Sequence, residues 1–411
     1  MIAQVVKDNL CMQCGMCAGV CPNDNIQMEQ DRTGEWYPVV GGNCSHCGKC
    51  VNSCAGWEVN FNLLNKEIFG KIPNDVYIGN FKKCYIGYSK DKKIRMESSS
   101  GGIVTSIGIY LLENRLVDGV VVVVDSKDPL HPKPIIARNK KDMINAMQSK
   151  YVSIPVNIMI KQILKEKGKF AFVGQPCQIH SIRKAERIDK RIKEKIIYKI
   201  GIFCEYRAKR DYLTFLAKKS GLDLKRVIGI KYREGNWPGN LQFRNTKIKK
   251  EFPITEYLYY PLTIPFIDTR CLKCIDHTNE LADISVGDAW CLNKSGEQGG
   301  WAVVIDRNDL ASKDLLKGIT TKIISKEKIN TSQKKPLSLK KEGYIHRSKF
   351  FLKLPVYENS LPTENLRVKM ENLLIFLLIF FKKIRLFQLF SLGMLRKYLR
   401  IVLKNIQLTK R

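Results

Sequence analysis

Two cysteine-rich runs near the N-terminus constrain what this chain can fold into more than any other feature. The first reads CMQCGMCAGVCP from Cys11, and the second reads CSHCGKCVNSC from Cys44. Each has the spacing C-x2-C-x2-C-x3-C, and the chain holds 14 cysteines in all. Cysteines three residues apart are poorly placed to bridge each other, but they can converge on one metal centre. No secretory signal precedes them, so we expect a cytoplasmic protein whose thiols stay reduced.

The spacing of the two runs favours iron–sulfur clusters over zinc. Zinc sites usually take two CxxC pairs, or one CxxC with two histidines. A run of four cysteines is typical of bacterial two-cluster ferredoxins, in which the fourth cysteine ligates the other cluster. We therefore predict a ferredoxin-like domain with two [4Fe–4S] clusters over residues 1–60, with zinc as the alternative. The predicted ligands are Cys11, Cys14, Cys17 and Cys54 for one cluster, and Cys44, Cys47, Cys50 and Cys21 for the other.

Charge and hydrophobic patterning divide the rest of the chain. Residues 1–60 hold 3 Lys/Arg and 6 Asp/Glu, whereas the whole chain carries a net charge of +31, and this shift marks a domain boundary. Glycine and proline breakers make residues 61–83 resemble a linker. Helical spacing then alternates with β-branched runs such as DGVVVVVD, which indicates an α/β domain. We predict an α+β chain with a mixed α/β core over residues 84–320, β-rich after residue 225.

Four further cysteines suggest a third metal centre. Cys177 and Cys204 follow apolar runs that resemble strands, and Cys271 and Cys274 form a CxxC pair. Ligand sites in open α/β sheets collect in the loops at the carboxyl ends of strands. Four thiolates suffice for a third [4Fe–4S] cluster. The alternative is that Cys177 and Cys204 are buried apolar residues, which is common for cysteine.

A segment rich in serine and glycine precedes a predicted helix. Residues 98–102 read SSSGG, and the apolar spacing of IVTSIGIYLLE follows. Free N–H groups and the helix dipole at such a start favour a phosphate or a flavin oxygen. The alternative is an ordinary serine N-cap. No G-x-G-x-x-G follows a strand, so the Rossmann dinucleotide fingerprint is absent.

Six segments in order resemble the motifs of the coenzyme F420 hydrogenase/dehydrogenase beta-subunit family (F420 is a deazaflavin). They are SSSGGIVTSIGIYLLE, QSKYV, FVGQPCQ, GIFCEY, YREGNWPG and CLKCIDHTNELADISVGD, and with the cysteine runs they cover residues 5–305. The resemblance implies an FAD-binding α/β core with its own [4Fe–4S] cluster, ligated by Cys177, Cys204, Cys271 and Cys274. The residues that it implies for FAD binding are Ser98, Ser99, Ser100, Gly101, Gly102, Thr105, Ser149, Lys150, Tyr151, Gly174, Gln175 and Pro176.

The resemblance also implies a redox function. A deazaflavin or nicotinamide gives or takes a hydride, iron–sulfur clusters pass one electron at a time, and FAD can do both. We expect a flavin- and iron–sulfur-dependent oxidoreductase without an acid–base triad, and the sequence identifies no catalytic residue. His180 and His277 are expected to be hydrogen-bonding neighbours of ligands. The expected redox partner is reduced F420, NAD(P)H, a ferredoxin or a small organic substrate.

Two other functions stay open at this point. The first is a non-catalytic electron-transfer subunit that serves a partner enzyme, for example in polysaccharide biosynthesis. The second is a zinc-binding interaction protein. The sequence shows no motif that interleaves basic and aromatic residues, so we do not expect a nucleic-acid partner. It predicts no oligomeric state.

The C-terminal region is basic. We expect an irregular extension over residues 321–360, followed by a segment over residues 361–411 with 11 Lys/Arg and 2 Asp/Glu. Its apolar run LLIFLLIFF has nine residues, whereas a membrane-spanning helix needs about 20. A basic amphipathic helix here indicates peripheral association with the inner face of the membrane. The alternative is a helix that docks on the core or on a partner subunit.

Overall fold

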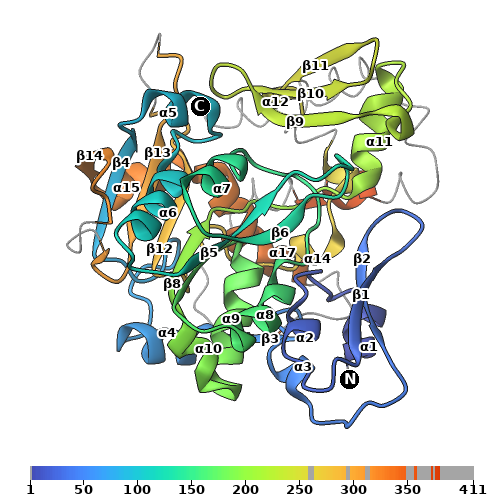
Figure 1. Ribbon diagram of the computed structural model, residues 1–411, viewed down its shortest axis with the longest axis vertical. Helices are drawn as coiled ribbons and strands as arrows, with labels where there is room; N and C mark the ends of the chain where they lie inside the picture. The colour runs from blue at the N-terminus through green and yellow to red at the C-terminus, as the bar shows by residue number, and fades with distance from the viewer. Residues whose placement is uncertain are drawn as a thin grey trace.

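An eight-stranded mixed sheet forms the centre of the molecule (Figure 1). The structure is a computed structural model that describes residues 2–257, 263–292, 297–310, 315–348, 356–358, 372–373 and 375–379. Five strands run in one direction, and β14, β13 and β6 run in the other. The spatial order is β14 (Ile319–Ile324), β4 (Lys83–Ser89), β13 (Ala302–Asp306), β12 (Ile284–Asp288), β8 (Ile196–Ile202), β7 (Phe170–Gly174), β5 (Gly119–Val124) and β6 (Lys133–Ala137).

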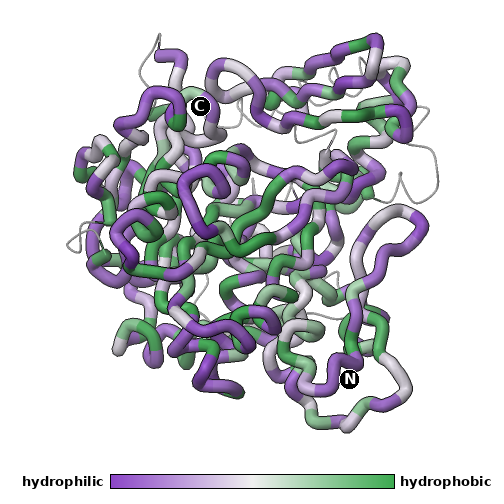
Figure 2. The backbone as a smooth tube through the Cα atoms, viewed as in Figure 1, coloured by the Kyte–Doolittle hydropathy of each residue, from purple (hydrophilic) through white to green (hydrophobic). Residues whose placement is uncertain are grey.

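Helices cover both faces of this sheet, which explains the continuous apolar run in β5. Successive strand residues point to opposite faces, so Val120 and Val122 pack on one face and Val121 packs on the other. Strands buried on both faces are hydrophobic along their length, as Figure 2 shows for the middle of the sheet. The first face carries α5 (Lys92–Glu97), α6 (Ile103–Glu113) and α7 (Lys140–Asn145). The second carries α8 (Met159–Lys165), α9 (Pro176–Ile188) and α10 (Lys190–Lys195). The predicted mixed α/β core is confirmed.

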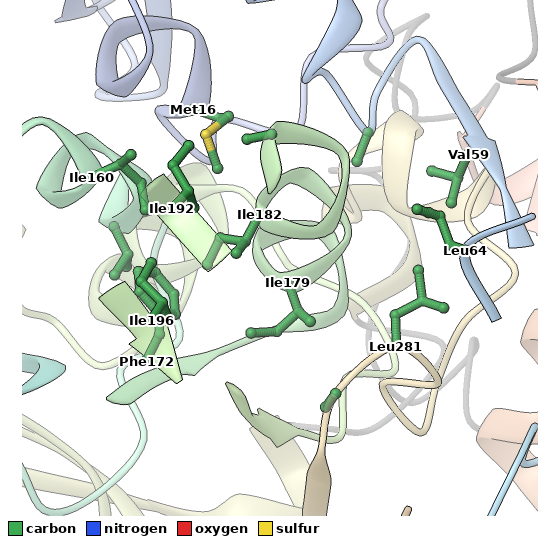
Figure 3. Close-up of a cluster of buried hydrophobic side chains, with 14 of the residues drawn as sticks. Met16, Val59, Leu64, Ile160, Phe172, Ile179, Ile182, Ile192, Ile196 and Leu281 are labelled. Carbon is green, nitrogen blue, oxygen red and sulfur yellow. The ribbon is translucent and has the colours of Figure 1, made fainter. Parts of the chain in front are cut away.

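The cysteine-rich N-terminal segment packs on the second face of the sheet, beside α8 and α9 (Figure 1). Met16 lies in the same buried cluster as Ile160, Ile179 and Ile182 (Figure 3). The segment therefore shares its hydrophobic core with the rest of the chain. Its elements are α1 (Ile2–Lys7), α2 (Met16–Gly19), β1 (Ile26–Gln30), β2 (Trp36–Val40), α3 (Lys49–Asn52) and β3 (Glu58–Asn60), which pairs with β15 (Val356–Glu358).

Two expected irregular regions contain regular structure. Part of the expected linker is helix α4 (Phe61–Phe69), whose Asn60 side chain caps the N-terminus and whose Phe61 is buried. The expectation of an irregular extension over residues 321–360 is wrong for residues 326–348, where buried residues recur with helical spacing but include polar side chains such as Gln333, Lys340 and Lys341. The helices are α15 (Lys326–Ser332), α16 (Lys334–Leu337), a π-helical turn (Ser338–Glu342) and α17 (Gly343–Ser348).

A second, smaller sheet lies at one end of the molecule (Figure 1). Strand β10 (Asn240–Arg244) pairs antiparallel with β9 (Gly229–Glu234) and with β11 (Lys249–Pro253). α11 (Arg210–Lys219) and α12 (Ile254–Tyr257) complete its hydrophobic core. The predicted β-rich region after residue 225 is confirmed, and its first strand carries the beginning of the YREGNWPG motif.

The described part of the C-terminal apolar run packs on the core. Residues 372–373 and 375–379 are helical, and Ile375 and Leu378 lie in a buried cluster with Leu272 and Leu339. The other residues of the predicted basic helix, 361–371, 374 and 380–411, lie outside the described residues. Within the described part of the chain, no helix has both the length and the apolar character that crossing a membrane requires.

We expect Ile375→Ala to lower the free energy of unfolding by about 2–4 kcal/mol, because Ile375 is 0% exposed and the change leaves a cavity. The matched control is Leu377→Ala on the same helix: Leu377 is 44% exposed, so its change should stay within about 0.5 kcal/mol. Urea unfolding of the full chain measures both. If Ile375→Ala leaves stability unchanged but abolishes co-sedimentation with anionic vesicles, the run is a membrane anchor and not a docked helix.

Candidate metal and cofactor site

The structure gathers Cys11, Cys14, Cys17 and Cys54, which we call the first thiol set. Burial is the main cause of the raised pKa of the Cys17 thiol, and the charges of the other three thiols raise that pKa further. Burial likewise raises the pKa of Cys11 to about 12 and that of Cys14 to about 11. Neutral thiols are therefore favoured here until a metal supplies the positive charge that thiolates require.

Close packing against the core holds the first thiol set in place. Gly15 has a φ of +83°, and a Cβ there would lie 2.8 Å from the carbonyl oxygen of Pro155. The N–H of Asn157 donates to the carbonyl oxygen of Cys14 at 2.8 Å. The Sγ of Cys14 and the Oγ of Ser181 on α9 lie 3.6 Å apart. The cysteine run is thus shaped by residues more than 100 positions away.

Cys21, Cys44, Cys47 and Cys50 form the second thiol set and line one cavity. This cavity lies at the outer side of the N-terminal segment, and Cys47 is exposed. The backbone N–H of Lys49 is the main cause that lowers the pKa of the Cys47 thiol. The second set therefore differs from the first in its access to solvent.

The third thiol set consists of Cys177, Cys204, Cys271 and Cys274. Burial raises the pKa of the Cys177 thiol, and the charges of Cys14, Cys204, Cys271 and Cys274 raise it further. The third set thus assembles at the carboxyl ends of β7 and β8, and it adjoins the first set through Cys14. It combines the second residue of α9, the loop after β8 and the end of α14 (Thr269–Leu272).

Each thiol set offers four cysteine sulfurs, all of them in free cysteines. Cysteine thiolates are the usual ligands of a [4Fe–4S] cluster, which takes four of them. The residues of each set therefore fit such a cluster by number and type of donor. Among the described residues, no group of three or more His, Cys, Asp or Glu side chains is already spaced to hold a single metal ion.

The two histidines near the third set are committed to hydrogen bonds. Nε2 of His180 lies 2.7 Å from Oδ2 of Asp276, and both side chains are buried. Nε2 of His277 lies 3.1 Å from Oε1 of Gln333. Burial lowers the pKa of His277 to about 4, so this imidazole is neutral at physiological pH.

Sequence patterns did not predict the buried cations around the third set. Lys340 is 2% exposed, and its Nζ donates to the carbonyl oxygen of Cys271 at 3.1 Å. Lys341 forms a buried pair with Glu280, and Arg270 is also buried. In the sequence these residues look like the many other Lys and Arg of a basic chain. No local signal distinguishes them, because their burial depends on which distant segments pack around them.

The predicted flavin residues fall into two groups at the carboxyl edge of the sheet. In the first group, the N–H of Ser149 donates to Oγ of Ser99 at 2.8 Å, which joins residues 149–151 to the loop of residues 98–102 (the 98–102 loop). Oγ of Ser98 and Oε1 of Gln148 are buried without a hydrogen-bond partner. Unsatisfied buried polar atoms call for a ligand or water, so this loop fits a polar edge of a flavin. Thr105 is buried in α6, which begins after Gly102.

The second group lies directly before the third thiol set. Gly174 ends β7, Gln175 caps α9 and Pro176 is the first residue of that helix. The amide of Asn279 donates to the carbonyl oxygen of Gly174 at 2.9 Å. These residues therefore shape the turn that presents Cys177.

The ammonium group of Lys150 is not free to bind a ligand at the carboxyl edge of the sheet. Its Nζ donates to the carbonyl oxygens of Ala146, Met147 and Gln148 at the end of α7. Burial lowers the pKa of Lys150 to about 8. Its ammonium group therefore completes the C-terminus of a helix.

Arg233, from the YREGNWPG motif, holds the 98–102 loop to the rest of the site. Its guanidinium donates to the carbonyl oxygen of Ser99 at 2.9 Å and to the hydroxyl of Tyr151 at 3.2 Å. It also forms a buried ion pair with Asp288 at the end of β12, which accepts a hydrogen bond from the indole of Trp237. The sequence of this motif alone did not indicate this role.

Two relatives with named functions are similar in sequence to this chain. The coenzyme F420-dependent sulfite reductase of Methanocaldococcus jannaschii is 28% identical over 323 residues, which are 74% of this chain and 45% of the reductase. This chain thus spans less than half of that relative. The coenzyme F420 hydrogenase subunit beta of Methanothermobacter thermautotrophicus is 28% identical over 264 residues, which are 61% of this chain and 86% of the subunit.

A chain of the F420-reducing [NiFe] hydrogenase complex from Methanosarcina barkeri shares the fold. It aligns with a TM-score of 0.53 and 23% identity, over 69% of this chain and 98% of that chain. The family models for the N-terminal and C-terminal parts of the coenzyme F420 hydrogenase/dehydrogenase beta subunit match residues 84–161 and 167–333. Together they cover more than half of the sequence, and the chain belongs to the coenzyme F420 hydrogenase/dehydrogenase beta-subunit family.

Proposed function

We propose that this protein is a flavin- and iron–sulfur-dependent oxidoreductase that couples hydride transfer to one-electron transfer through three [4Fe–4S] clusters. The names of its relatives support F420 as the hydride carrier. The single observation that carries the proposal is the spatial sequence of the sites. Contacts link the 98–102 loop to the third thiol set, the third set to the first, and the first set to the second, in which Cys47 is exposed.

A continuous series of hydrogen bonds links the 98–102 loop to the third thiol set. Arg233 joins Ser99 to Asp288, and the carbonyl oxygen of Asp288 accepts from the amide of Gln333 at 2.7 Å. Gln333 in turn bonds His277, whose carbonyl oxygen accepts from the N–H of Cys204. These contacts fix the loop and the thiols relative to each other, which supports electron exchange between a cofactor at each place.

The other thiol sets continue this order. Cys14 of the first set adjoins Cys177 of the third, and the second set lies farther out with Cys47 exposed. When bound, FAD would exchange two electrons as a hydride and the clusters would carry single electrons. One hydride therefore corresponds to two one-electron transfers. The exposed second set is where a one-electron partner protein would meet the chain.

The residues of this chain would bind and orient the groups that react. Ser98 and Gln148 offer unsatisfied polar atoms to a flavin, and Arg233 keeps the loop closed on the core. The buried side chains of His277 and Lys340 lie beside the third set. No described residue acts as a catalytic acid or base in this proposal.

Metal and cofactor analysis of the anaerobically purified, reconstituted chain tests the proposal. We expect about twelve iron atoms per chain, four for each [4Fe–4S] cluster, together with non-covalently bound FAD. Reduced F420, and NADPH in parallel, should then bleach the flavin absorbance and give EPR signals of reduced clusters. Stoichiometric zinc without iron uptake would contradict the proposal and favour the interaction protein.

A second candidate is an electron-transfer subunit without activity of its own. It is favoured by the fact that relatives are named as subunits of larger enzymes. The isolated chain would then bind its cofactors but would not oxidise reduced F420 or NADPH. Cluster reduction by an added one-electron donor would persist, which separates this outcome from a failure to bind cofactors.

A further inference from the structure

The turn before and within α14 lies where the first and third thiol sets meet. Asp268 caps α14 by accepting from the N–H of Arg270 at 2.9 Å, and Cys271 of the third set follows directly. The charge of Asp268 also raises the pKa of the Cys11 thiol in the first set, after the larger effect of burial. One short turn therefore faces two candidate cluster sites.

Arg270 bridges the two ends of the first thiol set. It is 1% exposed, and its Nε donates to the carbonyl oxygen of Leu10 at 3.1 Å. Its Nη2 donates to the carbonyl oxygen of Ala55 at 3.2 Å. Leu10 precedes Cys11 and Ala55 follows Cys54. The guanidinium thus holds two distant chain segments of the first set while its backbone adjoins Cys271 of the third.

Two lysines contact one set each. Nζ of Lys184 on α9 donates to the carbonyl oxygen of Cys54 at 3.0 Å, which places this charge at the first set. Lys340 donates to the carbonyl oxygen of Cys271 and lies near the thiols of Cys204 and Cys274, which places its charge at the third set. These two lysines provide matched comparisons for Arg270.

We infer that the turn from Asp268 to Arg270 tunes the clusters of the first and third thiol sets together, with Arg270 raising both reduction potentials and Asp268 lowering them. The inference rests on the proposed function, because it requires that these sets hold clusters. Both residues act as positioning residues through the charge that they hold between the sites.

The physical reason is the charge that reduction adds to a cluster. One added electron makes the cluster more negative, so a nearby buried cation stabilises the reduced form and a carboxylate destabilises it. Such interactions are strong in a buried site of low dielectric constant. Arg207 pairs with Asp268 and with Glu35, so it offsets part of the effect of Asp268. The effect of Asp268 is therefore smaller than that of a carboxylate without a cationic partner.

An EPR-monitored redox titration of the full, cofactor-loaded chain tests the inference. Arg270→Gln should shift the midpoint potentials of two clusters downward and leave the exposed second cluster unchanged. Lys184→Gln should shift the potential of the first cluster alone, and Lys340→Gln that of the third cluster alone. Unchanged potentials in an Arg270→Gln protein that keeps about twelve iron atoms would overturn the inference.

Asp268→Asn provides the second arm of the test. It keeps an oxygen that can cap α14 and removes one negative charge, so the same two potentials should shift upward. If Arg270→Gln does not fold or loses its clusters, this variant decides, and unchanged potentials in it would refute the shared role of the turn. Failure of the wild-type chain to bind iron would instead refute the proposed function.

Discussion

Cys204→Ser should remove about four of the twelve iron atoms and stop electron flow from the flavin to an external one-electron acceptor. Cys204 follows β8 and belongs to the third thiol set, which is linked to the 98–102 loop through His277 and adjoins the first set through Cys14. Loss of that set breaks the proposed path at its middle. Cys177→Ser, and a change at Cys271 or Cys274, should have the same effect.

Iron analysis and reduction of cytochrome c or a viologen dye by the loaded chain measure this result. The matched control is Cys84→Ser: Cys84 is 3% exposed but belongs to no thiol set, so its change should leave the iron content unaltered. Equal iron content and an unchanged EPR spectrum in the Cys204, Cys177, Cys271 and Cys274 variants would show that these cysteines are structural.

The double variant Gly101→Ala, Gly102→Ala should release most of the flavin while the iron content stays the same. Both glycines have positive φ, +66° and +76°, which costs an L-residue about 1–2 kcal/mol each. A Cβ on Gly101 would lie 2.8 Å from the carbonyl oxygen of Gly300, and one on Gly102 would lie 2.7 Å from Cγ2 of Ile94. The loop must therefore move, and the polar atoms that it presents move with it.

Gly221→Ala is the matched control. It separates displacement of the 98–102 loop from the backbone strain that any substitution at positive φ causes. Gly221 has a φ of +72°, but a Cβ there meets nothing within 4 Å, and it lies after α11, which packs on the smaller sheet. The Gly221→Ala protein should be less stable but should keep its flavin. Equilibrium dialysis with FAD, together with iron analysis, measures both effects. Full retention of FAD by the double variant, with its clusters intact, would place the flavin elsewhere.

Local spacing was enough to predict much of this protein. Alternation of apolar helices and strands predicted the α/β core, because the period of the hydrophobic pattern reports the secondary structure directly. The three-residue spacing of the cysteine runs predicted which neighbouring thiols face one centre. That these thiols bind iron stays a prediction, as does the flavin site.

Only the tertiary structure decided how these parts meet. Cys14 adjoins Cys177, far away in sequence, because α9 packs against the N-terminal segment. Arg270 and Lys340 are buried beside thiols, although the sequence presents them among 70 Lys and Arg residues. Burial of a charge depends on long-range packing, which local sequence does not encode. The sequence alone therefore determined the α/β core and the grouping of neighbouring cysteines. The fold decided which charges surround the candidate cluster sites.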